Sequence, residues 1–300
     1  MNKLIKKSQA SLLSKDERRN LEILLGDEDP KTYEAIQNLI LKNPDKYLEW
    51  LKACRLSNTH TVRNNAMMLI SKHFSMCSKA HFLMFCHTQP EHLDLEEGLF
   101  ALAKTEYPHI NVDGYKALLD YFVSSILDRI VHLESPHDII EEINRYLFEE
   151  EGFGGNQDDY YSPENNYINK VIDNRKGNPV GMSALIWLLG LRLHLPITGI
   201  GIPGHFLIRF QNNKEEIYID PYNKGRILTR RDCMRLAVAL GLEFKNSLLS
   251  PTTSRSTLLR ICSNLADSYR RLNNIEKATR SELFMSYLNR SFKANGHVSK

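Results

Sequence analysis

The stretch IPGHFLIRFQNNKEEIYIDPY, residues 202–222, decides the fold at the centre of this chain. Two runs rich in β-branched and aromatic residues flank Asn212 and Asn213, and asparagine tolerates the positive φ that a two-residue hairpin turn requires. A turn at these two residues places His205 directly opposite Asp220. Facing Cβ atoms in such a pair lie about 4.5–5.5 Å apart, so we expect a hydrogen bond between the imidazole and the carboxylate.

The same register sets Arg209 opposite Glu216, an opposite-charge pair that favours it over a slip of one residue. An aspartate beside a histidine orients the ring and stabilises its charged form, as the third member of a catalytic triad does. His205 and Asp220 are therefore either two members of a triad or a buried histidine satisfied by a neighbouring acid. A nucleophile beside them would decide between these interpretations.

An apolar helix precedes the hairpin in RKGNPVGMSALIWLLGLRLHLP, residues 175–196. Asn178 is a good N-cap, and Pro179 suits the first helical position because the N–H that it lacks has no intrahelical partner there. Apolar residues occupy nearly every side of this helix until it ends near Leu195. We therefore expect a central, buried helix.

The remaining sequence predicts an α+β fold that is mostly helical. Residues 16–150 carry apolar side chains at helical spacing, without the alternation typical of strands. Residues 149–167 hold three glycines among Asn, Asp and aromatic residues, which predicts a packed loop. We expect three regions: a helical N-terminal region (1–148), a central unit with a small antiparallel sheet (149–248) and a helical C-terminal pair (249–300).

Composition argues against several classes of function. The formal net charge of the 300 residues is only +3, with acids interspersed among bases, which disfavours nucleic-acid binding. The longest apolar run, VGMSALIWLLGL, is shorter than the roughly 20 residues that cross a bilayer, so we expect no membrane association. An odd cysteine count without an apolar signal segment predicts reduced thiols and a cytoplasmic location. The five cysteines are Cys54, Cys77, Cys86, Cys233 and Cys262.

The order of a helix opened after a glycine, a strand with His205 and a strand ending in Asp-Pro resembles the transglutaminase-like core, a relative of the papain-type cysteine proteases. From about residue 93 onward the chain more closely resembles the bacterial SirB-type (YchA-type) transglutaminase-like family. The segments that carry this resemblance include LEEGLFALAKTEYPHIN, RKGNPVGMSAL, GIGIPGHFLIRF and YIDPYNKGRILTRRDC. The final helix pair resembles that family's tetratricopeptide-like tail.

The resemblance implies a nucleophile at the start of the buried helix, where enzymes of the superfamily carry Gly-x-Cys. A helix N-terminus lowers the pKa of a thiol and so favours the reactive thiolate. The matching triplet here is Gly177-Asn178-Pro179, so proline stands at the position of the cysteine. His205 and Asp220 stand at the positions of the superfamily's catalytic histidine and aspartate, whereas the catalytic cysteine has no counterpart here.

Two residues are candidates for a substitute nucleophile. Ser183 lies one helical turn beyond Pro179 on the same face, although such a hydroxyl more often bonds back to the carbonyl four residues earlier. Cys233 lies in the segment TRRDC, where neighbouring positive charge favours a thiolate. We expect neither to replace the missing cysteine, because a catalytic site needs both geometry and chemistry.

The loop before the buried helix contributes candidate binding residues. Five residues of the loop match the SirB-type pattern: Glu150, Asn156, Asp159, Tyr160 and Asn165. The resemblance implies that they line a cleft beside His205, together with Asn178 at the start of the helix. The alternative, which we slightly favour, is that these side chains cap turns and satisfy the backbone of a packed loop, as Asn and Asp routinely do. The spacing of an EF-hand calcium loop is missing.

A second cluster lies in HFSMCSKAH, which sets His73, Cys77 and His81 four residues apart, with Cys86 and His92 beyond. Two ligands at this spacing can share a zinc ion. The interleaved Phe and Leu residues indicate ordinary core packing instead, and no clean paired-ligand motif accompanies them. We therefore expect no metal and no other cofactor.

These observations favour a catalytically degenerate transglutaminase-like protein that binds a peptide or protein partner in a papain-type cleft. The alternative is a cysteine- or serine-dependent hydrolase or amide transferase in which His205 is the base and Asp220 orients it. The two hypotheses differ in whether a nucleophile lies within about 3–4 Å of the imidazole.

Overall fold

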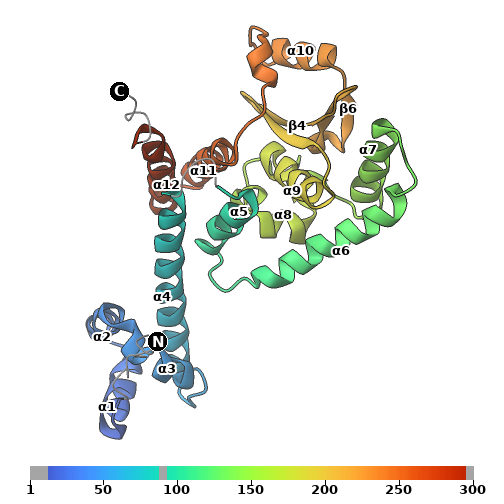
Figure 1. Ribbon diagram of the computed structural model, residues 1–300. Coiled ribbons are helices and arrows are strands. Elements are labelled where there is room, and N and C mark those ends of the chain that lie inside the picture. The colour runs from blue at the N-terminus through green and yellow to red at the C-terminus, as the bar shows by residue number, and fades with distance from the viewer. Residues whose placement is uncertain (1–12, 88–92, 295–300) are drawn as a thin grey trace, which may run out of the picture. The chain divides into compact units, whose positions relative to one another are not determined.

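The computed structural model describes residues 13–87 and 93–294, and Figure 1 shows the course of the chain. The fold is α+β and mostly helical, with a small antiparallel sheet in the central part of the sequence, which confirms the predicted class. The three regions expected from the sequence stay a prediction. No helix in the described part of the chain combines the length and the apolar character that spanning a bilayer requires.

A first compact unit, Met1–Ala80 with Thr105–His109, is built from helices. They are α1 (Lys15–Leu25), α2 (Pro30–Lys42), α3 (Pro44–Cys54) and most of α4 (His60–Cys86). Ser14 and Glu17 form a reciprocal capping box at the start of α1, and Asp29 caps α2. The buried apolar side chains of these helices form one core of their own.

A second compact unit, His81–Lys104 with Ile110–Lys300, contains the sheet. Besides the end of α4, its helices are α5 (Leu95–Lys104), α6 (Val112–Ile130), α7 (Pro136–Asn144), α8 (Ile168–Asn174), α9 (Pro179–Arg192), α10 (Arg230–Ala239), α11 (Ser254–Arg271) and α12 (Ile275–Ala294). Its strands are β1 (Gly154–Gly155), β2 (Lys176–Gly177), β3 (Ile197–Ile202), β4 (His205–Gln211), β5 (Glu216–Asp220) and β6 (Arg226–Leu228). A π-helical turn, Arg145–Glu150, extends α7, and a 3-10 turn, Pro221–Asn223, follows β5.

The main sheet of the second unit is antiparallel, with the strand order β3-β4-β5-β6, while β1 and β2 form a separate parallel pair. Figure 1 shows α9 on one side of the main sheet and α10 on the other. On the α9 side, Trp187 and Phe206 close over Gly199, where an added Cβ would lie 2.8 Å from the indole. On the α10 side, Cys233 is buried in a cluster with Leu207 and other strand residues.

The hairpin formed by β4 and β5 differs from the predicted register by two residues. Gln211, and not Arg209, faces Glu216, so the predicted two-residue turn is wrong. The loop has four residues, because the side-chain oxygen of Asn212 accepts hydrogen bonds from the backbone N–H groups two and three residues later, at 2.8 and 2.7 Å. Since side chains alternate with a period of two, the shift leaves His205 and Asp220 on a common face.

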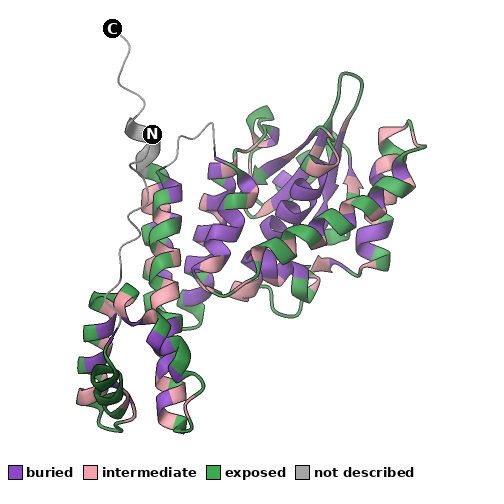
Figure 2. Cartoon of the chain, turned by 60° about the horizontal axis from the view of Figure 1, so that its bottom comes forward, coloured by how far each residue is buried: buried purple, intermediate pink, exposed green. Residues whose placement is uncertain are grey.

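The central helix α9 agrees with its sequence. The side-chain oxygen of Asn178 accepts a hydrogen bond from the Gly181 N–H at 2.9 Å, and Pro179 is the first helical residue. Every residue from Pro179 to Gly190 is buried, and Figure 2 shows burial concentrated on the sheet and the helix against it. The helix ends at Arg192, just before the predicted Leu195.

Candidate functional site

The imidazole of His205 and the carboxylate of Asp220 are in direct contact, as predicted. Nε2 of the histidine lies 2.9 Å from Oδ2 of the aspartate, and only 10% and 5% of the two side chains are exposed. Asn223 donates from its side-chain amide to the same oxygen at 2.8 Å and from its backbone N–H to Oδ1 at 3.2 Å. The carboxylate is therefore held from three directions by donors.

Burial and hydrogen bonding act in opposite directions on Asp220. Burial alone would raise the pKa of this carboxyl group, because it disfavours the charged form. The hydrogen bond and charge of His205, together with the two donors of Asn223, outweigh burial and hold the pKa below its ordinary value. Asp220 thus remains an ionised acceptor at neutral pH, which fixes Nε2 of the imidazole as a donor.

Turn chemistry brings these two side chains to the same end of the sheet. The two-residue turn Pro203-Gly204 joins β3 to β4, and Gly204 has a φ of +83°, which only glycine adopts readily. His205 follows as the first residue of β4, while Asp220 is the last residue of β5. Because β4 and β5 are antiparallel, the start of one lies beside the end of the other.

The N-terminus of α9 carries no nucleophile. Its cap, Asn178, is buried, and the amide of this side chain donates to the side-chain oxygen of Asn166 at 2.7 Å. The next residue, Pro179, has neither a thiol nor a hydroxyl. The helix α9 packs against β4, which begins with His205, and against the turn Pro221–Asn223, which follows Asp220. The helix is therefore a direct neighbour of the elements that hold the His205–Asp220 pair.

Neither substitute nucleophile lies in a reactive setting. Ser183 is fully buried, and its hydroxyl donates to the backbone carbonyl of Phe206 at 3.3 Å, not to the carbonyl four residues earlier. Cys233 is fully buried on the α10 side of the sheet. Burial raises the pKa of its thiol to about 12, and the charges of Asp232 and Glu216 add to the effect. The positive charge of Arg230 lowers the pKa, as expected from the sequence, but burial outweighs it.

The other cysteines offer no alternative at this site. None of the five cysteines forms a disulfide, and Cys77 alone among them is exposed. Cys77 belongs to the first unit, where its Sγ lies 3.7 Å from Nε2 of His73. Burial raises the pKa of Cys54 to about 11 and of Cys86 to about 12, and it also raises the pKa of Cys262. Thiols in this state are poor nucleophiles at neutral pH.

The predicted binding residues separate into two groups. Asn156 and Asn165 hold the loop together: the amide of Asn156 donates to Asn165 Oδ1 at 2.9 Å, and the amide of Asn165 donates to the carbonyls of Asp159 and Tyr160. These contacts agree with the interpretation as a packed loop. Glu150 is engaged elsewhere, in an exposed bidentate ion pair with Arg129 at 2.6 and 2.7 Å.

Two residues that the sequence analysis did not single out adjoin the pair, namely Tyr222 and Asn223. The Tyr222 ring meets the His205 ring edge-to-face at 6.3 Å between centroids, and its hydroxyl donates to the Asn156 carbonyl at 3.3 Å. The sequence signal that could have identified them is their position directly after Asp220 and Pro221, at the end of β5. Both border a hollow of about 390 Å³, whose other lining residues are Gly154, Gly155, Gln157, Asp158 and Lys224.

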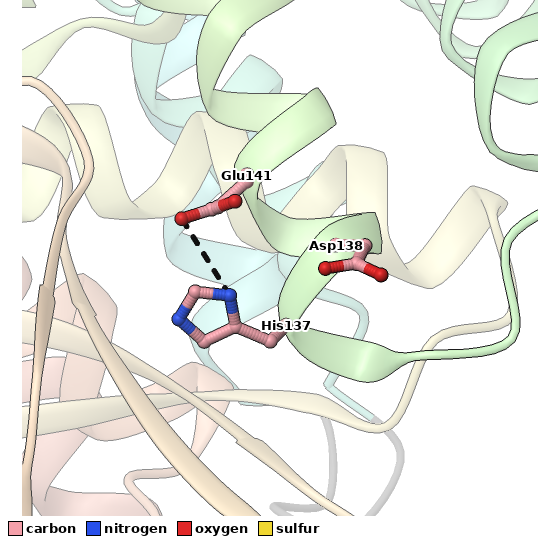
Figure 3. Close-up of side chains that lie close together, drawn as sticks. All are labelled: His137, Asp138 and Glu141. Carbon is pink, nitrogen blue, oxygen red and sulfur yellow. Dashed lines mark ion pairs between the residues drawn. The ribbon is translucent and has the colours of Figure 1, made fainter.

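No metal site is assigned. Of the residues that the sequence analysis weighed as zinc ligands, Cys77 lies beside His73, and His92 lies outside the described residues. Among the described residues, the one group with metal-ligating atoms close together is His137, Asp138 and Glu141, all exposed on the first turn and a half of α7. Figure 3 shows an ion pair between His137 and Glu141 and none to Asp138.

Comparison with known proteins adds the family. The model of the transglutaminase-like superfamily matches residues 113–263. A UPF0162 protein of Xylella fastidiosa (strain 9a5c) is 32% identical over 196 residues, which cover 63% of this chain and 70% of the relative. A UPF0162 protein of Vibrio cholerae is 29% identical over 149 residues, which cover 49% of this chain and 55% of the relative. No solved structure matches.

A further relative is F-box only protein 21 of Homo sapiens, 30% identical over 144 residues that cover 45% of this chain and 22% of that protein. The similarity thus extends beyond bacterial chains of comparable length. The family model covers half of the residues, including the helix start at Pro179 and the His205–Asp220 pair. The chain belongs to the transglutaminase-like superfamily, and its relatives there include the UPF0162 proteins.

Proposed function

We propose that the second unit is a catalytically degenerate transglutaminase-like module that binds an extended peptide segment of a partner protein beside His205. One observation carries the proposal: the His205–Asp220 pair is built, buried and oriented, while the neighbouring helix opens with Pro179 in place of a nucleophile. An acyl transfer through a covalent intermediate requires that nucleophile. Binding a ligand through hydrogen bonds requires no nucleophile.

The pair has the chemistry to bind a peptide. Since Nε2 of His205 donates to Asp220, Nδ1 is an acceptor in the form of the ring that carries a single N–H. Nδ1 has no hydrogen bond to any described residue, so the N–H of a peptide backbone can donate to it. Tyr222 adds an aromatic side chain at contact distance from the ring. An acceptor next to an aromatic side chain is a common arrangement in peptide-binding grooves.

The relatives lend support to a module that acts through protein contacts. The similar segment makes up about a fifth of F-box only protein 21, so it occurs there as part of a larger chain. We also assign α11 and α12 as a tetratricopeptide-like pair, which the burial of Leu265, Tyr269 and Ala278 supports. None of the five cysteines forms a disulfide, which supports the cytoplasmic location expected from the sequence.

The alternative, a hydrolase or amide transferase, requires Ser183 or Cys233 to attack a substrate. Full burial of both side chains speaks against it. An acyl-transfer assay separates the two functions: the chain is incubated with hydroxylamine and a degenerate nonapeptide library that contains glutamine. Transfer of the glutamine acyl group would release ammonia and form a hydroxamate, and we expect none above the buffer control.

Binding is measured with the same library, fluorescently labelled, by anisotropy. We expect saturable binding that falls at least about tenfold in His205→Ala, while thermal unfolding shows that the variant remains folded. His205→Gln is the second variant, since its amide can still donate to Asp220. Hydroxamate formation that depends on His205 would overturn degeneracy, and a folded His205→Ala chain that binds like the wild type would overturn the binding site.

A further inference from the structure

A row of aromatic rings extends from His205 across the surface of the second unit. The Tyr222 ring lies 5.8 Å from the Tyr160 ring, and the Tyr160 ring lies 5.1 Å from the Tyr161 ring, with interplanar angles of 80° and 81°. Each ring thus meets the next edge-to-face, the favoured arrangement of aromatic pairs. The row links the turn after β5 to the loop before α8.

Two arginines of α11 complete this row. The guanidinium carbon of Arg271 lies 3.6 Å from the centroid of the Tyr161 ring. Arg260 donates to the carbonyl of Ile202 at 2.7 Å, next to the turn that leads into His205. We call Tyr160, Tyr161, Tyr222, Arg260 and Arg271 the tyrosine–arginine strip.

The strip is rigid and yet accessible. Tyr160 and Tyr161 are 39% and 49% exposed. The backbone of Tyr160 is held by the Asn165 amide at 3.1 Å. Tyr222 packs directly onto Gly155, where an added Cβ would lie 2.5 Å from the ring. Large aromatic side chains that are both fixed and exposed lose little conformational freedom when a ligand binds, which is typical of binding surfaces.

The charge of the strip is positive and unneutralised. Among the described residues, no carboxylate pairs with Arg260 or Arg271, whereas the neighbouring Arg270 pairs with Asp267. Burial and Tyr161 raise the pKa of Tyr160, and the charge of Arg260 opposes them, which places this guanidinium within electrostatic reach of the row. An incoming carboxylate would therefore meet two cations whose charge no carboxylate of the described residues pairs with.

We propose that the tyrosine–arginine strip binds an extended acidic peptide, whose backbone lies along the tyrosines and whose carboxylates pair with Arg260 and Arg271. This inference rests on the proposed peptide-binding function and names its partner class. Rings and arginines also bind single-stranded nucleic acid. A peptide is favoured because the strip contributes two arginines and the net charge of the chain is only +3, whereas nucleic-acid binding relies on many phosphate contacts.

The test compares two fluorescent nonapeptide libraries that differ only in charge: one contains Asp and Glu, and the other has Asn and Gln in their place. We expect the wild-type chain to bind the acidic library about tenfold more tightly, and the preference to weaken as salt is raised. In the double variant Arg260→Gln/Arg271→Gln the preference should fall below about twofold, with affinity for the neutral library retained. The matched control is Arg231→Gln/Arg235→Gln, which removes two exposed charges from α10 and should keep the preference.

The outcomes separate this inference from the proposed function. Equal binding of both libraries that still depends on His205 would overturn the acidic-peptide inference and leave the peptide-binding function standing. Binding of neither library would overturn both. Tighter binding of an oligouridylate than of the acidic library, lost in Arg260→Gln/Arg271→Gln, would assign the strip to single-stranded nucleic acid and overturn the inference. Circular dichroism of each variant shows that a loss does not come from unfolding.

Discussion

Two histidines of the second unit each lie beside a carboxylate, and the two pairs differ in nearly every physical respect. His205 and Asp220 come from different strands, lie 2.9 Å apart and are almost fully buried. His137 and Glu141 come from one helix, lie 3.5 Å apart and keep 51% and 61% of their side chains exposed. Helical spacing alone brings the second pair together, whereas the first exists only when the sheet is folded. A histidine close to a carboxylate therefore indicates a functional site only where the tertiary fold brings the two side chains together.

The largest expected loss of stability comes from a substitution that breaks the buried His205–Asp220 pair. Asp220→Ala removes the acceptor of both His205 and Asn223, and we expect the free energy of unfolding to fall by about 3 kcal/mol. Urea denaturation followed by circular dichroism measures this loss. Glu141→Ala is the matched control, and its unfolding midpoint should stay that of the wild type, because exposed ion pairs contribute little. Equal losses in the two variants would erase the distinction between the pairs.

The pH dependence of stability sharpens the same comparison. The pKa of Asp220 is lower in the folded chain than its ordinary value of 3.8, so the unfolded state takes up the proton first as pH falls. The contribution of the pair is complete well above that value and is lost as pH falls through the folded pKa. We expect the stability difference between wild type and Asp220→Asn to be constant above about pH 5 and to shrink as pH falls below 3.8 toward the folded pKa. A difference that grows on acidification would contradict the lowered pKa.

An introduced nucleophile tests whether the buried pair has the geometry of a catalytic site. Pro179→Cys places a thiol at the first position of α9, where the helix N-terminus favours the thiolate and an imidazole that takes up the thiol proton would favour it further. We expect this thiol to react with iodoacetamide at pH 7 at least about tenfold faster than Cys233, as followed by mass spectrometry. The double variant with His205→Ala should lose the gain. A Pro179→Cys thiol that reacts as slowly as Cys233 would show that the pair does not have catalytic geometry.

The smallest expected effect concerns the third donor to Asp220. Asn223→Ala removes its side-chain amide and should lower the free energy of unfolding by about 1 kcal/mol, since His205 and the backbone N–H of residue 223 remain as donors. Urea denaturation measures the change. Asn213→Ala, an exposed residue of the β4–β5 loop, serves as the control and should have no measurable effect. A loss as large as that of Asp220→Ala would mean that Asn223, and not His205, is the main partner of the carboxylate.

Much of the centre of the molecule was predictable from local patterns. The cap at Asn178, the buried helix after it and the His205–Asp220 contact all follow from residue type and spacing. The hairpin register did not, because the side chain of Asn212 stabilises a longer loop than the two asparagines suggest. The contact survived this error because a shift of two residues keeps every side chain on its face.

Features that depend on packing between distant segments were not predictable. Neighbouring positive charges in the sequence favour a thiolate at Cys233, whereas burial beneath the sheet is the largest influence on its pKa in the structure. The tyrosine row joins residues 160 and 161 to residue 222, and Arg271 reaches it from a helix about fifty residues further on. No periodicity relates such positions, so only the fold brings them together.

The enclosure of α9 has a consequence for how relatives of this chain diverge. From Pro179 to Gly190 the helix has no exposed side, so a substitution there disturbs packing before it alters any ligand. Tyr160 and Tyr161 project from a loop whose backbone is held by Asn165, and their side chains can be exchanged without repacking the core. New partners can thus be acquired by replacing a few loop residues over an unchanged interior.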